Sequence, residues 1–217
     1  MMPQTELLYR DKLVDYFILG LMWVAFIIVH SLLATASCKQ WLGKQFSISR
    51  RNYRISYNAI SISMLLLPLW WSISLPHQTL WAWSGILGVI VDVITILAVL
   101  LFIWTLRYYP LGEFFGLTVV PKNSSKLVFS PIHRYVRHPW YFTGLVFLWT
   151  RDMTDVFLVT ACLVTFYFII GSRREDSKLT IKFGDRYRQY RSQVGGIFPV
   201  PWRYLTREQW QSLNATR

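Results

Sequence analysis

Two groups of polar residues hold the side chains best suited to chemistry in this chain of 217 residues. The first is the run Arg-His-Pro-Trp-Tyr at positions 137–141, and the second is the acidic pair Glu175 and Asp176, with Tyr187 further along. Both groups border long apolar stretches, where ionisable side chains are costly and mark functional sites. A guanidinium binds carboxylates in a forked geometry, and a carboxylate accepts hydrogen bonds from hydroxyl and ammonium groups. The two groups therefore predict a binding or catalytic site in the C-terminal third.

The elements that position these residues are expected to cross a membrane. Hydrophobic residues make up 53% of the chain and charged residues 16%, and the mean hydropathy is +0.32. These values are too apolar for an ordinary soluble domain and predict a small integral membrane protein. A helix needs about 20 apolar residues to cross a hydrocarbon core of ~30 Å. Four stretches are long enough: Leu13 to Ala34, Ile55 to Leu75, Trp81 to Leu106 and Trp140 to Gly171.

The fourth stretch is interrupted by polar residues at positions 151–155. Such a break favours a helical hairpin, so the total becomes five spans. Pro139 suits the first turn of the first hairpin helix, and Gly144 allows a close helix contact. Beyond the spans, Leu111 to Pro131 contains turn-forming residues and is expected to be an irregular connection. Glu175 to Val194 has the periodicity of an amphipathic helix.

The predicted fold is an all-α polytopic membrane bundle with about five transmembrane helices and a C-terminal amphipathic cytoplasmic helix. Residues 1–106 are expected to hold three N-terminal transmembrane helices, and residues 107–217 the catalytic part, in one integrated domain. Between the predicted spans, 20 of the 23 Lys and Arg residues lie on one side. This bias predicts that the N-terminus is outside and the C-terminus in the cytoplasm. The net charge of +12 indicates contact with anionic membrane lipids and disfavours a nucleic-acid partner.

Other residue types give weaker signals. The two cysteines, Cys38 and Cys162, support neither a disulfide nor a metal site, and no Gly-rich phosphate loop, zinc-ligand spacing or nucleophile elbow is present in the sequence. His30 is either a helix-packing residue or a metal or haem ligand that lacks a partner at ligand spacing. Asp92, in the middle of a predicted span, is either a buried structural hydrogen-bond partner or a substrate contact. The sequence leaves these alternatives open.

The polar groups together resemble those of a known superfamily. The run Tyr135-Val136-Arg137-His138-Pro139-Trp140-Tyr141 with Gly144 is followed by an acidic pair, Phe183-Gly184, Tyr187, Tyr190 and Pro199. This order resembles the isoprenylcysteine carboxyl methyltransferase and phospholipid methyltransferase superfamily of integral membrane methyltransferases. The N-terminal run His-Ser-Leu-Leu-Ala at 30–34 is similar to the bacterial branch that includes NnrU-type and methanethiol S-methyltransferase-like proteins.

The resemblance implies a methyltransferase that uses S-adenosylmethionine, held on the cytoplasmic side of the last two spans. Arg137 and Arg174 would be the catalytic residues. The residues expected to bind the cofactor are His138, Pro139, Tyr141, Glu175, Tyr135 and Tyr187; a metal is not expected. The acceptor would be a small lipophilic or membrane-accessible molecule with a thiol or carboxylate nucleophile, and the location the bacterial inner membrane.

The chain departs from the superfamily pattern at its acidic pair. The superfamily usually has Glu-Glu where this chain has Glu175-Asp176, so the role of the second position is open. Two other functions also stay open. Membrane reductases of the sterol and steroid type share a similar His-Pro/Tyr hairpin and would bind NADPH, and an NnrU-like accessory protein would keep the fold without catalysis. The sequence does not specify the acceptor or the oligomeric state, because pocket shape decides the acceptor.

Overall fold

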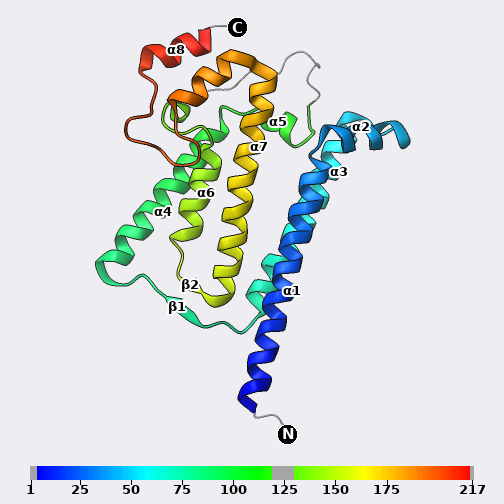
Figure 1. The fold of residues 1–217 in the computed structure, drawn as a ribbon, viewed down its shortest axis with the longest axis vertical. Helices are drawn as coiled ribbons and strands as arrows, with labels where there is room; N and C mark the ends of the chain where they lie inside the picture. The colour runs from blue at the N-terminus through cyan, green and yellow to red at the C-terminus, as the bar shows by residue number, and fades with distance from the viewer. Residues whose placement is uncertain (1–3, 119–129, 216–217) are drawn as a thin grey trace. The chain divides into compact units, whose positions relative to one another are not determined.

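The computed structural model describes residues 4–118 and 130–215 of the chain. Helices dominate these residues, as the sequence predicts (Figure 1). The chain divides into two compact units, and each is described by itself. The first unit contains Met1–Trp81, Leu111–Pro121 and Met153–Leu163, and the second contains Ala82–Pro110, Lys122–Asp152 and Val164–Arg217.

Three helices in the described ranges are long and apolar enough to cross a membrane, in agreement with the predicted integral membrane protein. They are Lys12–Leu33 within α1 (Gln4–Leu33), α4 (Gly85–Leu106) and α7 (Asp155–Gln193). The two other predicted spans correspond to α3 (Arg50–Ser74) and to α6 (Pro139–Trp149), which has only 11 residues. The total of five spans therefore stays a prediction.

In the first unit, α1 and α3 run side by side in opposite directions and are joined by α2 (Ala36–Gln45), as Figure 1 shows. The α2 helix begins where the Thr35 hydroxyl accepts a hydrogen bond from the Cys38 N–H, which satisfies one of the free donors of the first turn. The Tyr53 hydroxyl donates to the Leu33 carbonyl at 2.6 Å and ties the start of α3 to the end of α1. Sequence analysis does not predict α2, because its residues lack an apolar run.

Two very short strands pair antiparallel in the first unit: β1 (Thr79–Trp81) and β2 (Met153–Thr154). Because β1 uses residues 79–81, the span expected from Trp81 begins instead at Gly85. β2 occupies the polar break that was expected between the two hairpin helices, and α7 starts directly after it.

The connection expected from Leu111 to Pro131 is only partly described, because residues 119–129 lie outside the described residues. Pro121, Lys122 and Lys126 are among them. The connection begins with a short helix, α5 (Leu111–Phe114), and ends in the 3-10 turn η1 (Pro131–Arg134).

In the second unit, α6 packs against α4 and α7. The Trp140 indole N–H donates to the Thr105 hydroxyl of α4 at 2.8 Å. Pro139 is the first residue of α6, where its missing N–H costs nothing. The predicted close contact at Gly144 is confirmed, because a Cβ at that position would lie 3.0 Å from the Phe168 ring of α7.

The predicted amphipathic helix from Glu175 to Val194 is wrong in its boundary. It is not a separate helix, because α7 continues without interruption through the end of the apolar stretch at Gly171. The chain changes direction later, at Gly184, whose φ of 60° and ψ of −137° are accessible mainly to glycine. Beyond this bend, the last part of α7 folds back, as the orange segment of Figure 1 shows.

The folded-back part of α7 covers a small apolar core. Its buried members are Tyr187, Tyr190, Val194 and Leu205, and Leu179, Phe183, Trp210 and Leu213 pack against them. The last helix, α8 (Arg207–Ala215), contributes two of these residues and begins with a capping box. Thr206 and Gln209 exchange side-chain to backbone hydrogen bonds there, at 3.2 and 2.8 Å.

Candidate active site

The backbone of the Arg-His motif, Arg137 and His138, pairs with a segment that comes much later in the sequence. Val136 forms a parallel bridge with Gly195, and the Arg137 N–H donates to the Gly195 carbonyl at 2.9 Å. The His138 N–H donates to the Gly196 carbonyl at 3.2 Å. A Cβ at Gly195 would collide with a backbone carbonyl oxygen, so glycine is required at that position. This pairing places the motif beside the end of α7.

The centre of the site is the carboxylate of Asp176, whose side chain is 5% exposed. The Arg137 guanidinium donates to it from Nη2 at 2.7 Å and from Nε at 3.3 Å, which is the forked geometry. His138 Nε2 donates at 2.9 Å and the Tyr187 hydroxyl at 2.6 Å. Arg191 adds a cation at 3.6 Å. Asp176 is therefore fully used by protein donors, as a buried charge must be.

The remaining guanidinium nitrogen of Arg137 caps the end of α7. Its Nη1 donates to the carbonyls of Arg191, at 3.0 Å, and of Val194. These carbonyls have no partner within the helix, and a cation beside them is also favoured by the helix dipole. All three nitrogens of Arg137 thus bind the protein itself, and its side chain is only 10% exposed. In this arrangement Arg137 positions the site, whereas its predicted catalytic role stays a prediction.

The bend at Gly184 closes this arrangement. Tyr187 lies 11 residues after Asp176, which is three helical turns in a straight helix, about 16 Å. Because the helix folds back at Gly184, the Tyr187 hydroxyl reaches the Asp176 carboxylate instead of pointing away along the axis.

His138 lies between the two carboxylates of the acidic pair. Its Nε2 binds Asp176, and its Nδ1 lies 3.5 Å from Glu175 Oε2. Burial lowers the pKa of His138, but the hydrogen bonds to Asp176 and Glu175 outweigh burial and hold the pKa above its ordinary value. Since both ring nitrogens face carboxylates, the imidazolium form is favoured. Glu175 itself is 49% exposed and keeps acceptor capacity for another molecule.

Aromatic rings extend the site from His138 along α6. The Tyr141 ring stacks on His138 with centroids 5.5 Å apart and on Phe168 at 4.9 Å. Gly171 leaves space at the Tyr141 hydroxyl, because a Cβ there would lie 3.4 Å from it. A cation or a sulfonium is attracted to the faces of such rings.

A second histidine of the region, His133, has the opposite electrostatic character. The Ser130 N–H donates to His133 Nδ1 at 3.0 Å, so this nitrogen is the acceptor, and Nε2 carries the proton that faces the Tyr109 hydroxyl at 3.3 Å. Burial lowers the pKa of His133 to about 4. The Tyr190 hydroxyl donates to its backbone carbonyl at 2.8 Å. His133 is thus a neutral structural partner that holds η1 against the folded-back part of α7.

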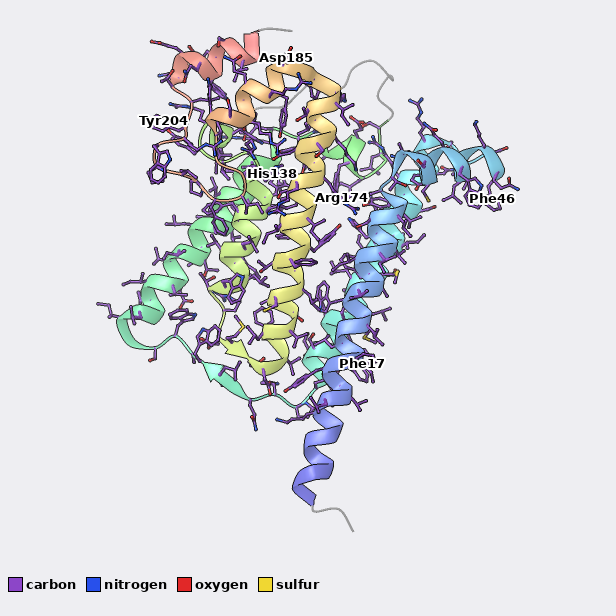
Figure 2. All side chains as sticks on the ribbon, viewed as in Figure 1. Phe17, Phe46, His138, Arg174, Asp185 and Tyr204 are labelled. Carbon is purple, nitrogen blue, oxygen red and sulfur yellow. The ribbon has the colours of Figure 1, made fainter. Side chains whose placement is uncertain are left out.

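The structure brings six of the eight predicted site residues together: Arg137, His138, Pro139, Tyr141, Glu175 and Tyr187. Tyr135 lies apart from them, 46% exposed, with its ring stacked on Tyr204. Arg174 is exposed on α7, and Figure 2 labels it together with His138. In the described part of the chain, no group of three or more His, Cys, Asp and Glu side chains is arranged to hold a metal.

Sequence analysis left the second acidic position open, yet Asp176 is the residue to which the others bind. A signal for this was present in the spacing. Asp176 precedes Leu179 by three residues and Phe183 by seven, so it lies on the same helical face as the apolar stripe. A carboxylate on a buried face needs several donors, whereas Glu175 falls one position away, toward the exposed side.

Sequence comparison finds relatives that bear the name methanethiol S-methyltransferase. Methanethiol S-methyltransferase 1 of Bradyrhizobium diazoefficiens is 29% identical over 203 residues, which cover 84% of this chain and 66% of that protein. The relative from Crocosphaera subtropica is 27% identical over 206 residues, covering 89% of this chain and 77% of that protein. The relative from Mycobacterium tuberculosis is 28% identical over 202 residues, covering 82% and 76%. No family model and no solved structure matches the chain.

Over most of its length the chain is similar to proteins named methanethiol S-methyltransferase, and this similarity supports a membrane methyltransferase of the isoprenylcysteine methyltransferase type. The relatives align over most of the chain, in agreement with the superfamily resemblance predicted from the sequence. These relatives do not favour the reductase alternative.

Proposed function

We propose that this protein is an S-adenosylmethionine-dependent S-methyltransferase whose acceptor is a small, membrane-accessible thiol. The proposal rests on a difference between the two carboxylates of the acidic pair, Glu175 and Asp176. Asp176 is saturated by protein donors, whereas Glu175, beside His138, is half exposed and available to a ligand. The names of the relatives, which refer to a thiol acceptor, support a thiol over a carboxylate.

The residues present suit S-adenosylmethionine. Glu175 can accept hydrogen bonds from the ribose hydroxyls or the ammonium group, and the Tyr141 hydroxyl, beside Gly171, can hydrogen-bond to the cofactor. When bound, S-adenosylmethionine supplies a methyl group on a sulfonium sulfur, which an incoming nucleophile displaces in line. Arg174, exposed one residue before Glu175, can pair with a carboxylate.

The chain's own residues contribute mainly by position. In-line displacement at carbon needs alignment of the reacting groups and exclusion of water more than proton transfer. The buried bonds around Asp176 fix the backbone at His138 and the end of α7, so Glu175 and Tyr141 are held in place before a ligand arrives. The thiolate is the nucleophilic form of the acceptor, so the thiol gives its proton to water before its sulfur attacks.

The proposed location is the bacterial inner membrane, with the N-terminus outside and the site at the cytoplasmic face. The distribution of Lys and Arg supports this orientation. A reporter fused to the C-terminus should report the cytoplasm, and one inserted at residues 76–79 should report the opposite side. The reverse pattern would contradict a cytoplasmic site.

The decisive experiment uses the full-length protein in lipid nanodiscs with S-adenosylmethionine labelled in its methyl group. With methanethiol we expect labelled dimethyl sulfide in the headspace, and with a lipophilic carboxylic acid we expect much less product. Titration with S-adenosylhomocysteine should show binding, whereas NADPH should show none. NADPH binding without methyl transfer would support a reductase, and binding of neither would support an accessory protein.

Glu175→Gln links this activity to the site. Loss of charge-assisted hydrogen bonds should weaken S-adenosylhomocysteine by about 1.5–3 kcal/mol. The matched control is Glu113→Gln, which changes a part-buried carboxylate of α5. Unchanged affinity in a folded Glu175→Gln protein would remove Glu175 from the cofactor site.

A further inference from the structure

The α2 helix and the residues that follow it form a surface that the proposed methyl transfer does not use. No residue of α2 is buried. Trp41 and Phe46 are each 61% exposed, and their rings touch edge to face with centroids 6.4 Å apart. Large aromatic side chains that gather at the surface of a protein indicate an interaction site.

The surface is strongly basic. Residues 36–54 contain Lys39, Lys44, Arg50, Arg51 and Arg54 and no acidic residue. The nearest carboxylates in the sequence are Asp15 and Asp92. In the described part of the first unit, Glu113 lies close to this region, and its carboxylate is bound by Arg54 at 2.7 Å. The other four cations, Lys39, Lys44, Arg50 and Arg51, are all exposed at the surface of this unit.

The position of α2 matches the level of a membrane surface. The apolar span of α1 ends at Leu33, and α2 begins three residues later. Figure 1 shows α2 running across the end of the α1–α3 pair instead of continuing either helix, and Figure 2 labels Phe46 at its outer end. A helix that turns aside at the end of an apolar span is placed to lie along the interface between headgroups and acyl chains.

We propose that α2, with the basic start of α3, is a binding surface for anionic lipid headgroups, called here the α2 surface (residues 36–51). Trp41 and Phe46 insert at the boundary of the acyl chains, as aromatic side chains do at membrane interfaces. Lys39, Lys44, Arg50 and Arg51 contact the lipid phosphates. A second copy of the chain fits the surface poorly, because two α2 surfaces would bring eight cations together without a carboxylate.

The test is a depth measurement on the full-length protein in nanodiscs. A spin label is attached at Trp41→Cys in a background with Cys38→Ser and Cys162→Ser. Its collisions with oxygen and with a water-soluble nickel complex are compared in zwitterionic and in anionic nanodiscs. The expected label depth is about 5–10 Å below the headgroup level. The readout is the oxygen-to-nickel ratio, which is the label's collision rate with oxygen divided by its collision rate with the nickel complex. The matched control is Gln211→Cys on the polar helix α8, where this ratio should be several-fold lower.

The dependence of the label depth on lipid charge distinguishes binding of anionic headgroups from insertion that is driven by the aromatic side chains alone. Anionic lipid should increase the oxygen-to-nickel ratio at position 41. Replacing Lys39, Lys44, Arg50 and Arg51 together by Gln should abolish that increase, and high salt should reduce it. A label at Phe46→Cys provides the same readout if the change at Trp41 disturbs folding.

Three results would overturn the proposal. A label at position 41 that is as open to nickel as the control in both lipids would show that α2 lies in water. Protection from both oxygen and nickel would show that α2 is covered by protein. A short label-to-label distance between two copies in the same nanodisc would identify a dimer interface.

Discussion

Arg137 and Asp176 approach to 2.7 Å in the second unit, and Arg54 and Glu113 approach to the same distance in the first. The side chains of the first pair are 10% and 5% exposed, whereas those of the second pair are 35% and 29% exposed. The two ion pairs therefore have the same length but differ in the free energy that is lost when one partner is removed. A buried ion pair that loses one member leaves an uncompensated charge, while a part-exposed pair exchanges its partner for water.

The two pairs also differ in what surrounds them. Asp176 receives hydrogen bonds from three side chains, two from the adjacent residues Arg137 and His138 and one from Tyr187 beyond the bend. The Glu113 carboxylate accepts a hydrogen bond from Arg54, and Arg54 also donates to the Glu113 backbone carbonyl. The first arrangement fixes a site, and the second fastens a short loop helix to α3.

The largest effect is expected for Asp176→Asn. The change leaves the buried Arg137 without its counter-ion, which costs about 3–5 kcal/mol of unfolding free energy. The measurement is unfolding of the full-length protein in mixed micelles. The control is Asp185→Asn, an exposed carboxylate after the bend of the same helix, labelled in Figure 2, which should change little. Equal stability of the two variants would contradict a buried charge cluster.

Gly184→Ala should have the next largest effect. A Cβ at Gly184 meets no atom within 4 Å, so the cost is conformational, about 1–3 kcal/mol for alanine at a φ of 60° and ψ of −137°. S-adenosylhomocysteine affinity should fall with stability, because the Tyr187 hydroxyl depends on the bend. Gly20→Ala, in α1 with equally open surroundings, is the control and should be neutral or slightly stabilising. A Gly184→Ala protein that behaves like Gly20→Ala would show that the bend is not required.

His133 supplies a pH-dependent test of the second unit. Its folded pKa, lowered to about 4 by burial, lies below the ordinary value of 6.5. The unfolded chain therefore binds a proton between these values while the folded chain does not, so stability falls as the pH drops from 6.5 to 4. One proton gives a slope of about 1.4 kcal/mol per pH unit. His133→Gln should flatten the stability profile in this window by that amount, and an unchanged profile would contradict a neutral buried His133.

The smallest effect is expected at the exposed pair. Arg54→Gln and Glu113→Gln, combined in a double-mutant cycle, should give a coupling of at most about 1 kcal/mol that decreases with salt. Arg54→Gln should cost more than Glu113→Gln, because Arg54 also binds the Glu113 backbone carbonyl. A coupling as large as that of Arg137 with Asp176 would remove the distinction between the two regions.

Apolar length was sufficient to predict α1, α4 and the apolar part of α7, because the cost of backbone polar groups in hydrocarbon leaves helices as the main solution. The polar helices α2 and α8 were not predicted, since their residues carry no apolar run of helical length. The true bend at Gly184 was missed for a different reason. A single glycine in a helical pattern is compatible with a straight helix, and only its φ distinguishes a bend.

At the site, the motif residues predicted a cluster but not the relations within it. Arg137 was expected to act on a ligand, yet its three nitrogens bind Asp176 and the end of α7. This arrangement depends on residues 191–194, more than 50 positions later, so spacing within the motif carries no information about it. The acidic pair was recognised as a unit. Asp176 and Glu175 differ in their contacts because Asp176 is buried and Glu175 is half exposed. The periodicity of a sequence indicates which of two neighbours is buried only when the buried face of the helix is known.

The pairing of residues 136–138 with Gly195 and Gly196 also has a consequence for biosynthesis. The motif leaves the ribosome nearly sixty residues before the segment that completes it, and Leu205 donates to the Arg134 carbonyl later still. Until that segment has been translated, the guanidinium of Arg137 has no helix end to cap. A truncated chain that stops before residue 190 thus lacks both the helix end that Arg137 caps and the backbone of Gly195 and Gly196 that pairs with the motif.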